Sequence, residues 1–484
     1  MTGTAAPPHA HSWVWAVLAP EHRRVCVLGD PGLNATLREA GLHVREDLDS
    51  GAPAPDAVLV GGASRTPAVL RSAARLRGAE VVAVAVGGGR EALPDRMPRW
   101  LRALELGLSP LHSAGAIVRA AWTARLLAGG GREVQRIATG ERARRYGLGP
   151  RSWRWRHRLP VGWVLAGWSG PRRASVAERI VGEAAGRLGA SLSWSAAGVV
   201  ETGKLMIELV DHMGNRYVLR VAAGAARPPL ERALRSLAAL GGADLPVALQ
   251  ERIPWPLVDG EVGCARYALE GKARGSHPAR MTAALWRDCL EFLIALRQVC
   301  PDGVRDADRG ATALADHVRA VAGHLDGGGR AALARVEREL HDRLGPVPLG
   351  WAHGDFTRNN LFAEAGRLRS VVDWEWAAPD ALPLLDLLEL TVQWDPRARR
   401  LPRGRRLTDM LLPFAHAGGD ERVRRYCAVT GTPEDPRTLA GLAVAQWLTR
   451  MARELAPPLD PSRTSAWVAE NLRTPLAALD HGAW

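Results

Sequence analysis

The chain has 484 residues, which is longer than one average domain and predicts two or three. An apolar fraction of 47% and a charged fraction of 24% are ordinary for a globular protein and exclude a disordered or fibrous chain. The formal net charge is +13, almost all from arginine, since the only lysines are Lys204 and Lys272. No nucleic-acid module accompanies this charge, so we expect no nucleic-acid partner.

No stretch approaches the roughly 18 apolar residues of a membrane span, so we expect no transmembrane segment and a cytoplasmic location. The five cysteines are scattered and form no C-x-x-C pair, which predicts neither a disulfide framework nor a zinc site.

Strand and helix signals alternate from residue 23 to about residue 90. Short Val-, Ala- and Leu-rich runs separated by helices are typical of a parallel sheet covered on both faces. We therefore predict an α/β domain of Rossmann-like type over residues 1–150. Strands are expected at 24–29, 43–48, 56–62 and 80–88, and helices at 35–40 and 66–77.

Whether this first domain binds a ligand is left open by its residues. Gly29-Asp30-Pro31-Gly32 follows the first strand, where a phosphate-binding loop would lie, and Glu46 or Asp47 stands where a ribose-binding acid is often found. The full G-x-G-x-x-G pattern is absent. A purely structural domain and a nucleotide-binding domain are both compatible with this pattern.

Residues 151–174 are rich in Trp, Arg, Gly and Pro. Interleaved Arg and Trp would suit stacking on bases or a membrane surface. We interpret the segment instead as an interdomain linker whose tryptophans pack against a neighbouring lobe.

Residues 175–272 predict a small sheet with helices. Ser175 and Glu178 form a capping-box pattern that begins a helix reaching about Leu188. A further helix is expected at 229–240, and strands at 191–200, 205–210, 217–222, 247–253 and 265–270. Residues 273–484 are mostly helical in pattern, with helices expected at 282–299, 312–325 and 330–344.

The most informative stretch is residues 351–375. His353-Gly354-Asp355 is followed by Asn360 five positions after the aspartate, and then by Asp373 at the end of an apolar strand. Such a set suits phosphoryl transfer, because one carboxylate orients the attacking hydroxyl while an amide and a second carboxylate hold Mg²⁺.

This stretch resembles the aminoglycoside phosphotransferase and choline kinase-like family, whose motif is H-G-D-x-x-x-x-N followed by a strand that ends in D-x-E. The resemblance covers about residues 175–484. It implies an α+β bilobal protein-kinase-like fold, with a small antiparallel sheet lobe at 175–272 and a helical lobe at 273–484. It also implies a small-molecule kinase that uses Mg²⁺ and ATP or GTP to phosphorylate a hydroxyl group.

The resemblance assigns roles to six residues of this stretch and the helix after it. Asp355 would be the catalytic carboxylate, and Asn360 and Asp373 the Mg²⁺ ligands. The residues that would hold these three in position are His353, Glu375 and Asp386.

Four residues of the small lobe are the expected nucleotide contacts. Arg220 stands where kinases usually carry a lysine, and Glu231 is its expected ion-pair partner, unless it is an ordinary surface glutamate. Gly203 and Lys204 would approach the phosphates, although a plain β-turn also explains them. Residues 271–275 would form the interlobe hinge that contacts adenine.

The acceptor and the oligomeric state are not readable from the sequence. A sugar, an amino alcohol or an aminoglycoside-like compound would serve, and the arginine-rich run 397–406 makes a neutral or anionic acceptor at least as plausible as an aminoglycoside. Two other interpretations stay open. One is a catalytically silent kinase-like binding or regulatory protein, and the other is a transferase whose active domain is the N-terminal one.

Overall fold

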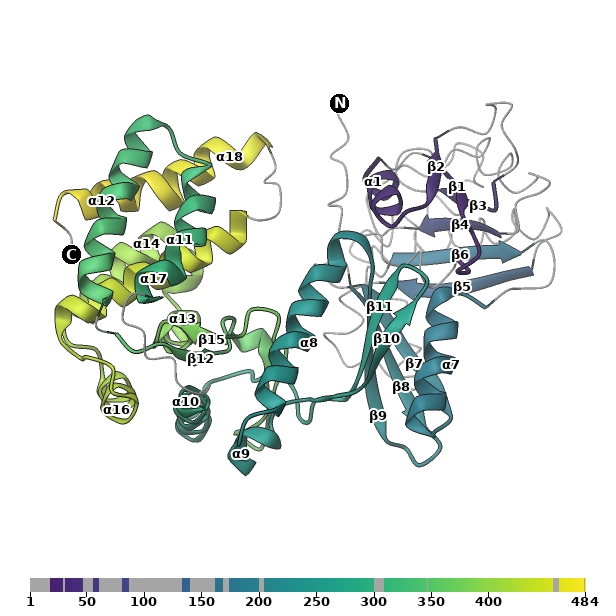
Figure 1. The fold of residues 1–484 in the computed structure, drawn as a ribbon, viewed down its shortest axis with the longest axis horizontal. Helices are drawn as coiled ribbons and strands as arrows, with labels where there is room; N and C mark the ends of the chain where they lie inside the picture. The colour runs from purple at the N-terminus through teal and green to yellow at the C-terminus, as the bar shows by residue number, and fades with distance from the viewer. Residues whose placement is uncertain are drawn as a thin grey trace, which may run out of the picture. The chain divides into compact units, whose positions relative to one another are not determined.

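The computed structural model separates into two compact units (Figure 1). The first unit comprises Met1–Glu231 and Trp255–Lys272, and the second comprises Arg232–Pro254 and Ala273–Trp484. The structure describes residues 18–28, 31–46, 55–60, 81–86, 133–139, 162–168, 174–199, 204–299, 309–345, 347–455, 461–482 and 484.

A six-stranded sheet lies in the N-terminal part of the first unit. Its order is β2-β1-β3-β4-β6-β5, in which β2, β1, β3 and β4 pair in parallel and β6 pairs antiparallel with both β4 and β5. The strands are β1 Arg24–Leu28, β2 His43–Arg45, β3 Ala57–Val60, β4 Val81–Val86, β5 Glu133–Thr139 and β6 Gly162–Trp168, with helix α1 at Pro31–Glu39.

The four parallel strands agree with the predicted pattern, whereas the antiparallel pair β5 and β6 was not expected. The helix predicted at 66–77 lies outside the described residues, as does the Gly29-Asp30 part of the candidate phosphate loop. The Rossmann-like assignment therefore stays a prediction.

The interpretation of residues 151–174 as a linker requires correction. Strand β6 lies within it and is bonded on both sides, to β4 and to β5. Its sequence GWVLAGW is apolar throughout, as expected of a strand inside a sheet. The Trp, Gly and Pro content that suggested a linker conceals this strand.

A five-stranded antiparallel sheet forms the rest of the first unit, in the order β10-β11-β9-β8-β7. Helix α7 (Val176–Leu188) begins with the predicted capping box, in which the Ser175 hydroxyl accepts from the Glu178 amide and the Glu178 carboxylate accepts from the Ser175 amide. The strands are β7 Leu192–Val199, β8 Leu205–Asp211, β9 Arg216–Ala222, β10 Pro256–Val262 and β11 Ala265–Gly271.

The strand predicted at 247–253 is wrong. Val247–Gln250 forms the short helix α9, and the strand that pairs with β11 is β10. Leu249 and Ile253, four residues apart, are buried while Val247 is exposed, which is a helical rather than an alternating pattern. The Pro, Asp and Gly of β10 resemble a turn in sequence and conceal the strand.

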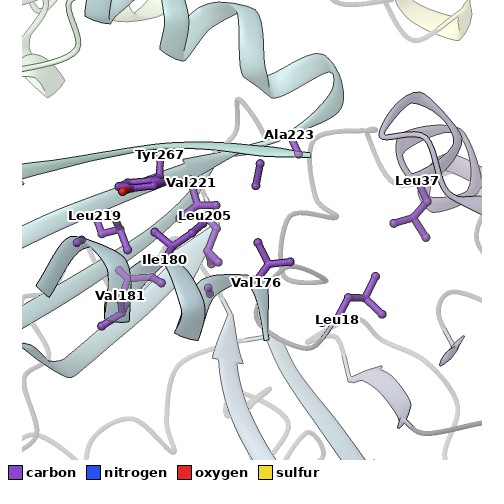
Figure 2. Close-up of a cluster of buried hydrophobic side chains, with 14 of the residues drawn as sticks. Leu18, Leu37, Val176, Ile180, Val181, Leu205, Leu219, Val221, Ala223 and Tyr267 are labelled. Carbon is purple, nitrogen blue, oxygen red and sulfur yellow. The ribbon is translucent and has the colours of Figure 1, made fainter. Parts of the chain in front are cut away.

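One hydrophobic core joins the N-terminal strands to the five-stranded sheet. Leu18, Leu37, Val176, Ile180 and Tyr267 belong to a single buried cluster (Figure 2). The chain also bonds across it, since the amide of Val176, the first residue of α7, donates to the carbonyl of Leu18 at 2.8 Å. The domain boundary predicted at 151–174 therefore does not coincide with a break in the core.

The second unit is mainly helical, as predicted for residues 273–484 (Figure 1). Helix α8 (Arg227–Gly241) crosses from the first unit into the second. Two small antiparallel sheets, β12 with β15 and β13 with β14, carry the 351–375 stretch. Their bounds are β12 Gly350–Ala352, β13 Leu361–Glu364, β14 Arg367–Val371 and β15 Ala378–Ala381.

The three predicted helices of this unit are confirmed as α10 (Ala283–Gln298), α11 (Arg309–Ala322) and α12 (Gly327–Leu344). No helix in the described ranges combines the length and apolar character that crossing a membrane requires. The remaining helices are α13 Leu385–Trp394, α14 Arg403–Arg406, α15 Leu412–His416, α16 Glu421–Thr430, α17 Pro436–Leu455, α18 Pro461–Val468 and α19 Thr474–Asp480.

The shared core predicts that the N-terminal strands stabilise helix α7 and the five-stranded sheet. We expect Leu18→Ala to lower the free energy of unfolding by about 2–5 kcal/mol, the usual cost of a buried Leu-to-Ala change. The matched control Met213→Ala, at a side chain 74% exposed, should change it by less than about 0.5 kcal/mol. Denaturant unfolding followed by circular dichroism measures both.

A chain that begins at Ala174 should likewise be less stable than the whole protein, because it uncovers the apolar side of α7. Equal stability of the two chains would show that the first 150 residues are a separable domain, as the sequence predicts.

Candidate active site

The His353-Gly354-Asp355 turn connects β12 to a short 3-10 helix at Arg358–Asn360. Gly354 has φ of 79°, in the left-handed region, and a Cβ there would overlap the Trp376 carbonyl. Glycine is therefore required both by backbone conformation and by close packing. It sets the turn that presents Asp355.

Asp386, in the first helical turn of α13, fixes the His353-Gly354-Asp355 loop by hydrogen bonds to its backbone. Its Oδ2 accepts from the amides of His353 (2.8 Å) and Gly354 (3.2 Å), and its Oδ1 accepts from the amide of Phe356 (3.3 Å). The carboxylate is buried, so these three donors replace water as its solvation. Three of the four backbone amides of residues 353–356 are thereby tied to one side chain.

His353 is fully buried and connects the loop that contains Asp355 with the chain just before Asp373. Its Nδ1 accepts from the Asp355 amide (3.2 Å), which places its proton on Nε2, 3.1 Å from the carbonyl of Val372. His353 therefore ties the turn that contains Asp355 to the residue that precedes Asp373.

Asp355 and Asn360 are in direct contact. The Asn360 side-chain amide donates to Asp355 Oδ2 at 2.8 Å and to the Asp355 carbonyl at 2.9 Å. Because its nitrogen is committed to Asp355, the carbonyl oxygen of the Asn360 side chain is the atom left to act as a ligand. The side chain of Asp355 remains 23% exposed, which allows a small molecule to reach it.

Asp373 follows the end of β14 at Val371 after one further residue, Val372, close to where the apolar run placed it. The Val372 amide donates to the Asn360 carbonyl at 2.9 Å, which keeps the backbone of Asp373 next to Asn360. Asp373 has φ of 71°, a conformation uncommon for a residue other than glycine and frequent at functional sites. Glu375 lies two positions further and is buried.

The predicted nucleotide contacts belong to the first unit. Arg220 on β9 is buried and pairs with Glu270 on β11 at 3.0 Å. Lys204, at the start of β8, is also buried, whereas Gly203 lies outside the described residues.

The expected pair of Arg220 with Glu231 is wrong. Glu231 pairs instead with Arg227, four residues earlier on α8, at 2.6 Å. Arg220 and Glu270 lie on neighbouring strands, where opposite-charge pairs across the ladder are within reach. The kinase resemblance pointed to the residue on the following helix, but strand pairing brings Glu270 within reach of Arg220.

The structure adds Glu389 and Gln393, which the sequence analysis missed, to the predicted Asp386. On α13 these three residues recur at the three- and four-residue spacing of one helical face. Gln393 accepts from the Arg358 amide (3.0 Å) and donates to Glu389 (2.7 Å). One face of α13 therefore bonds to the loop near His353, through Asp386, and again at Arg358, through Gln393.

Helix α17 contributes a matching polar face with Gln446, Arg450 and Arg453. Arg450 Nη1 donates to Asp355 Oδ1 at 2.5 Å, and Arg453 Nη1 donates to the Gly354 carbonyl. Gln446 bonds to Glu389 of α13. The signal that would have found these residues is polar side chains at helical spacing inside an otherwise apolar helix.

Burial and charge together shift the pKa values of this cluster. Burial disfavours the Glu389 carboxylate, but Arg450 and Arg403 outweigh it and hold the pKa of Glu389 below its ordinary value. Burial opposes the charge of Arg450, yet Glu389 and Asp355 raise its pKa. Burial and the neighbouring Arg450 lower the pKa of Arg453 to about 10, so it remains charged at neutral pH.

The arrangement suits a site that positions its substrates, and it does not resemble a site in which protein ligands alone surround a metal ion. Within the part of the chain that the structure describes, no group of three or more His, Cys, Asp and Glu side chains is arranged to hold a metal ion. Asn360 and Asp373 offer two oxygen ligands. Mg²⁺ is often held by one or two protein ligands and completed by water and substrate phosphates.

Residues 207–426 match the model of the Phosphotransferase enzyme family. The matched span begins in β8, ends in α16 and includes Asp355, Asn360 and Asp373. A search of curated proteins found no match. The chain therefore carries a phosphotransferase-family domain between residues 207 and 426.

Solved structures of several phosphotransferases are distantly similar. A thermostable mutant of aminoglycoside phosphotransferase APH(4)-Ia is 18% identical over 62% of this chain and 98% of its own, with a TM-score of 0.43. Macrolide 2'-phosphotransferase MphH from Brachybacterium faecium is 17% identical over 61% and 96%, with 0.40. Aminoglycoside phosphotransferase APH(3'')-Id from Streptomyces rimosus is 17% identical over 56% and 97%, with 0.36.

The lowered pKa of Glu389 predicts an acid-sensitive contribution to stability. A carboxylate with a depressed folded-state pKa stabilises the fold above its unfolded value of 4.5 and loses that effect as pH falls through the folded-state value. We expect Glu389→Gln to destabilise by about 3–5 kcal/mol at pH 7, because it leaves buried arginine charge uncompensated. The difference from wild type should shrink below pH 4.5.

Chemical denaturation at pH 7, 5, 4 and 3 measures this difference. Glu364→Gln, at a side chain 63% exposed, is the control and should match wild type throughout. A cost for Glu389→Gln that does not vary with pH would show that Glu389 is uncharged in the folded protein.

Proposed function

We propose that this chain, whose residues 207–426 carry a phosphotransferase-family domain, transfers the γ-phosphoryl group of ATP or GTP to a hydroxyl group of a small molecule. The observation that carries the proposal is the turn in which Asp355 and Asn360 bond directly while Asp386 fixes its backbone. Phosphoryl transfer asks a protein mainly to position groups and to neutralise charge. A rigid, partly exposed carboxylate beside an amide oxygen serves both needs.

Asp355 is the proposed catalytic carboxylate. Each of its oxygens has one side-chain donor in the structure, Arg450 on Oδ1 and Asn360 on Oδ2. A carboxylate oxygen accepts more than one hydrogen bond, so an acceptor hydroxyl can still bind. Asp355 would orient this hydroxyl and take its proton, an effect that typically contributes about 10²–10⁴-fold to the rate.

Asn360 and Asp373 are the proposed Mg²⁺ ligands, with Glu375 behind them. When bound, Mg²⁺ would neutralise the charge of the nucleotide phosphates. The bond from Asn360 to Asp355 orients the amide so that its oxygen faces away from the carboxylate, and the Val372 bond keeps Asp373 alongside. His353 and Asp386 would maintain these positions.

Arg220 and Lys204 are the proposed contributors of positive charge toward the nucleotide. Glu270 replaces Glu231 as the partner that orients Arg220. Arginine retains its charge when buried and binds phosphate oxygens in pairs, which suits this role. The parallel strands β1 to β4 support the further proposal that the N-terminal sheet is Rossmann-like, and no ligand is assigned to it.

A nucleotide-binding protein without turnover is the second candidate. The observation that favours it is the Arg450 bond to Asp355, because an ion-paired carboxylate is a weaker base for an acceptor hydroxyl. Turnover measurements separate the two candidates.

We expect ATP or GTP to bind only in the presence of Mg²⁺, because Asn360 and Asp373 offer ligands to the metal. Titration calorimetry with and without chelator measures this. Asn360→Ala and Asp373→Asn should each weaken binding at least tenfold. Asn359→Ala is the matched control, since its side chain is exposed and should leave affinity unchanged. Binding that persists with chelator contradicts the metal assignment.

Asp355→Asn should lower turnover by about 10²–10⁴-fold and leave nucleotide affinity within a few-fold, because the carboxylate acts on the acceptor rather than on the metal. Coupled measurement of nucleoside diphosphate release, together with calorimetry, separates the two effects. The exposed Asp380→Asn should behave as wild type. If Asp355→Asn loses nucleotide binding as severely as Asp373→Asn, the roles are misassigned.

A further inference from the structure

Two arginines of α17 stand beside the proposed catalytic carboxylate, and the proposed transfer reaction leaves them without a role. Arg450 and Arg453 lie one helical turn apart and contact the two neighbouring loop residues Asp355 and Gly354. Nε of each arginine is buried without a hydrogen-bond partner. An arginine placed here only to stabilise the loop would be expected to satisfy its donors.

Buried partners hold Arg450 in place. Glu389, 3% exposed, lies 3.8 Å from Arg450 Nε and keeps the guanidinium charged. Arg450 itself is 17% exposed, slightly less than Asp355. Its charge is therefore fixed at the point where an acceptor must approach Asp355.

The side of Arg450 that faces the protein interior offers no room for an acceptor. A cavity there has a volume of about 10 Å³ and is lined by Glu389, Arg403 and Arg406 among others. Such a space holds one water molecule at most. This cavity is therefore too small for an acceptor, whereas the partly exposed side chain of Asp355 contacts Arg450 on its own side.

Three arginines of the run 397–406, which suggested an anionic acceptor, pair with carboxylates of the protein. Arg397 pairs with Asp395 and Arg405 with Asp409, while Arg403 pairs with Glu389 and Glu454. These charges are already compensated within the protein. The arginine that contacts Asp355 itself is Arg450 of α17.

The two guanidinium groups near Asp355 differ in what else surrounds them. Arg453 lies with its Cζ 4.6 Å from the ring centre of Trp376, a cation–π contact that fixes its plane. Arg450 has no aromatic partner among the described residues, and it is the one that reaches the carboxylate. Arg450 is therefore the group better placed to meet an acceptor.

We propose that Arg450 selects an acceptor that carries a carboxylate or phosphate close to the hydroxyl to be phosphorylated. This inference rests on the proposed function and names its substrate class. An anionic group would accept from the guanidinium in a charge-assisted bond. A cationic acceptor would place an ammonium against Arg450 and lose affinity.

The reaction would proceed with the anion held by Arg450 and the hydroxyl on Asp355. The bond between the acceptor oxygen and the γ-phosphorus forms as the bond from that phosphorus to the β-phosphate oxygen breaks. The hydroxyl proton passes to Asp355, and the nucleoside diphosphate leaves. Arg450 changes no bond in this step, so it is a specificity residue.

Four three-carbon alcohols test the proposal in the full-length protein with Mg²⁺ and ATP or GTP: glycerate, glycerol 3-phosphate, glycerol and 2-amino-1,3-propanediol. We expect kcat/KM to be highest for an anionic member and lowest for the amino alcohol. Comparison of glycerate with glycerol phosphate distinguishes carboxylate from phosphate recognition. Arg450→Gln should lower the ratio of anionic to neutral kcat/KM by about 10–100-fold, mainly through KM, as expected for loss of one charge-assisted bond.

Two variants accompany this measurement. Arg450→Lys keeps the charge but not the paired geometry, so it should restore part of the ratio. Arg405→Gln, at a side chain 58% exposed, removes an arginine charge elsewhere and should leave the ratio unchanged.

Some results would overturn the inference while leaving the proposed function intact. These are a preference for the amino alcohol, or an anionic-to-neutral ratio that Arg450→Gln does not change. If none of the four is turned over, calorimetry of glycerate and glycerol 3-phosphate with the nucleotide-loaded protein decides. Binding that weakens at least tenfold in Arg450→Gln supports the proposal, and no binding at millimolar concentration overturns it. Failure of the proposed function itself would appear separately, as absence of Mg²⁺-dependent nucleotide binding.

Discussion

The buried carboxylate of Asp386 is the contact on which the candidate site depends. It accepts from three backbone amides of the turn that contains Asp355. Without it, these buried donors would lack an acceptor, at a cost of about 1–3 kcal/mol for each. Because Glu389 and Gln393 share its helical face, α13 fixes the turn, the 3-10 helix and Arg450 together. The position of the loop that contains Asp355 therefore depends on one face of α13, together with the contacts from α17.

The charged side chains around α13 compensate one another, so removal of any one leaves another buried charge less compensated. Glu389 and Arg450 are largely removed from water and compensate each other, along with Arg403. A buried ion pair adds little net stability compared with apolar residues, whereas removal of one member is expensive. Such a network contributes more to the precision of the loop than to the stability of the fold. Its placement beside Asp355 fits a need for fixed charge at the site.

Sequence patterns predicted the features that depend on residues close together in the chain. They missed the features that depend on contacts between residues far apart in the chain. The capping box at Ser175 and the order His353, Asp355, Asn360, Asp373 were readable because each depends on short spacings. Arg450 lies 95 positions from Asp355, and Glu270 lies 50 positions from Arg220, so no local pattern connects them. Strand β10 was missed because its Pro, Asp and Gly favour turns, and pairing with β11 overrides that preference. The domain boundary was misplaced for a related reason, because composition does not show which distant apolar residues share a core.

The shared core of the first unit has a consequence for how the protein is made. Leu18 belongs to the same buried cluster as Leu269. At about 5–20 residues per second, ribosomes need roughly 10–50 seconds to synthesise the chain between them. During that interval the N-terminal strands have no complete partner surface, and long-range contacts of this kind fold slowly. The N-terminal strands are thus synthesised well before the surface that buries them is complete.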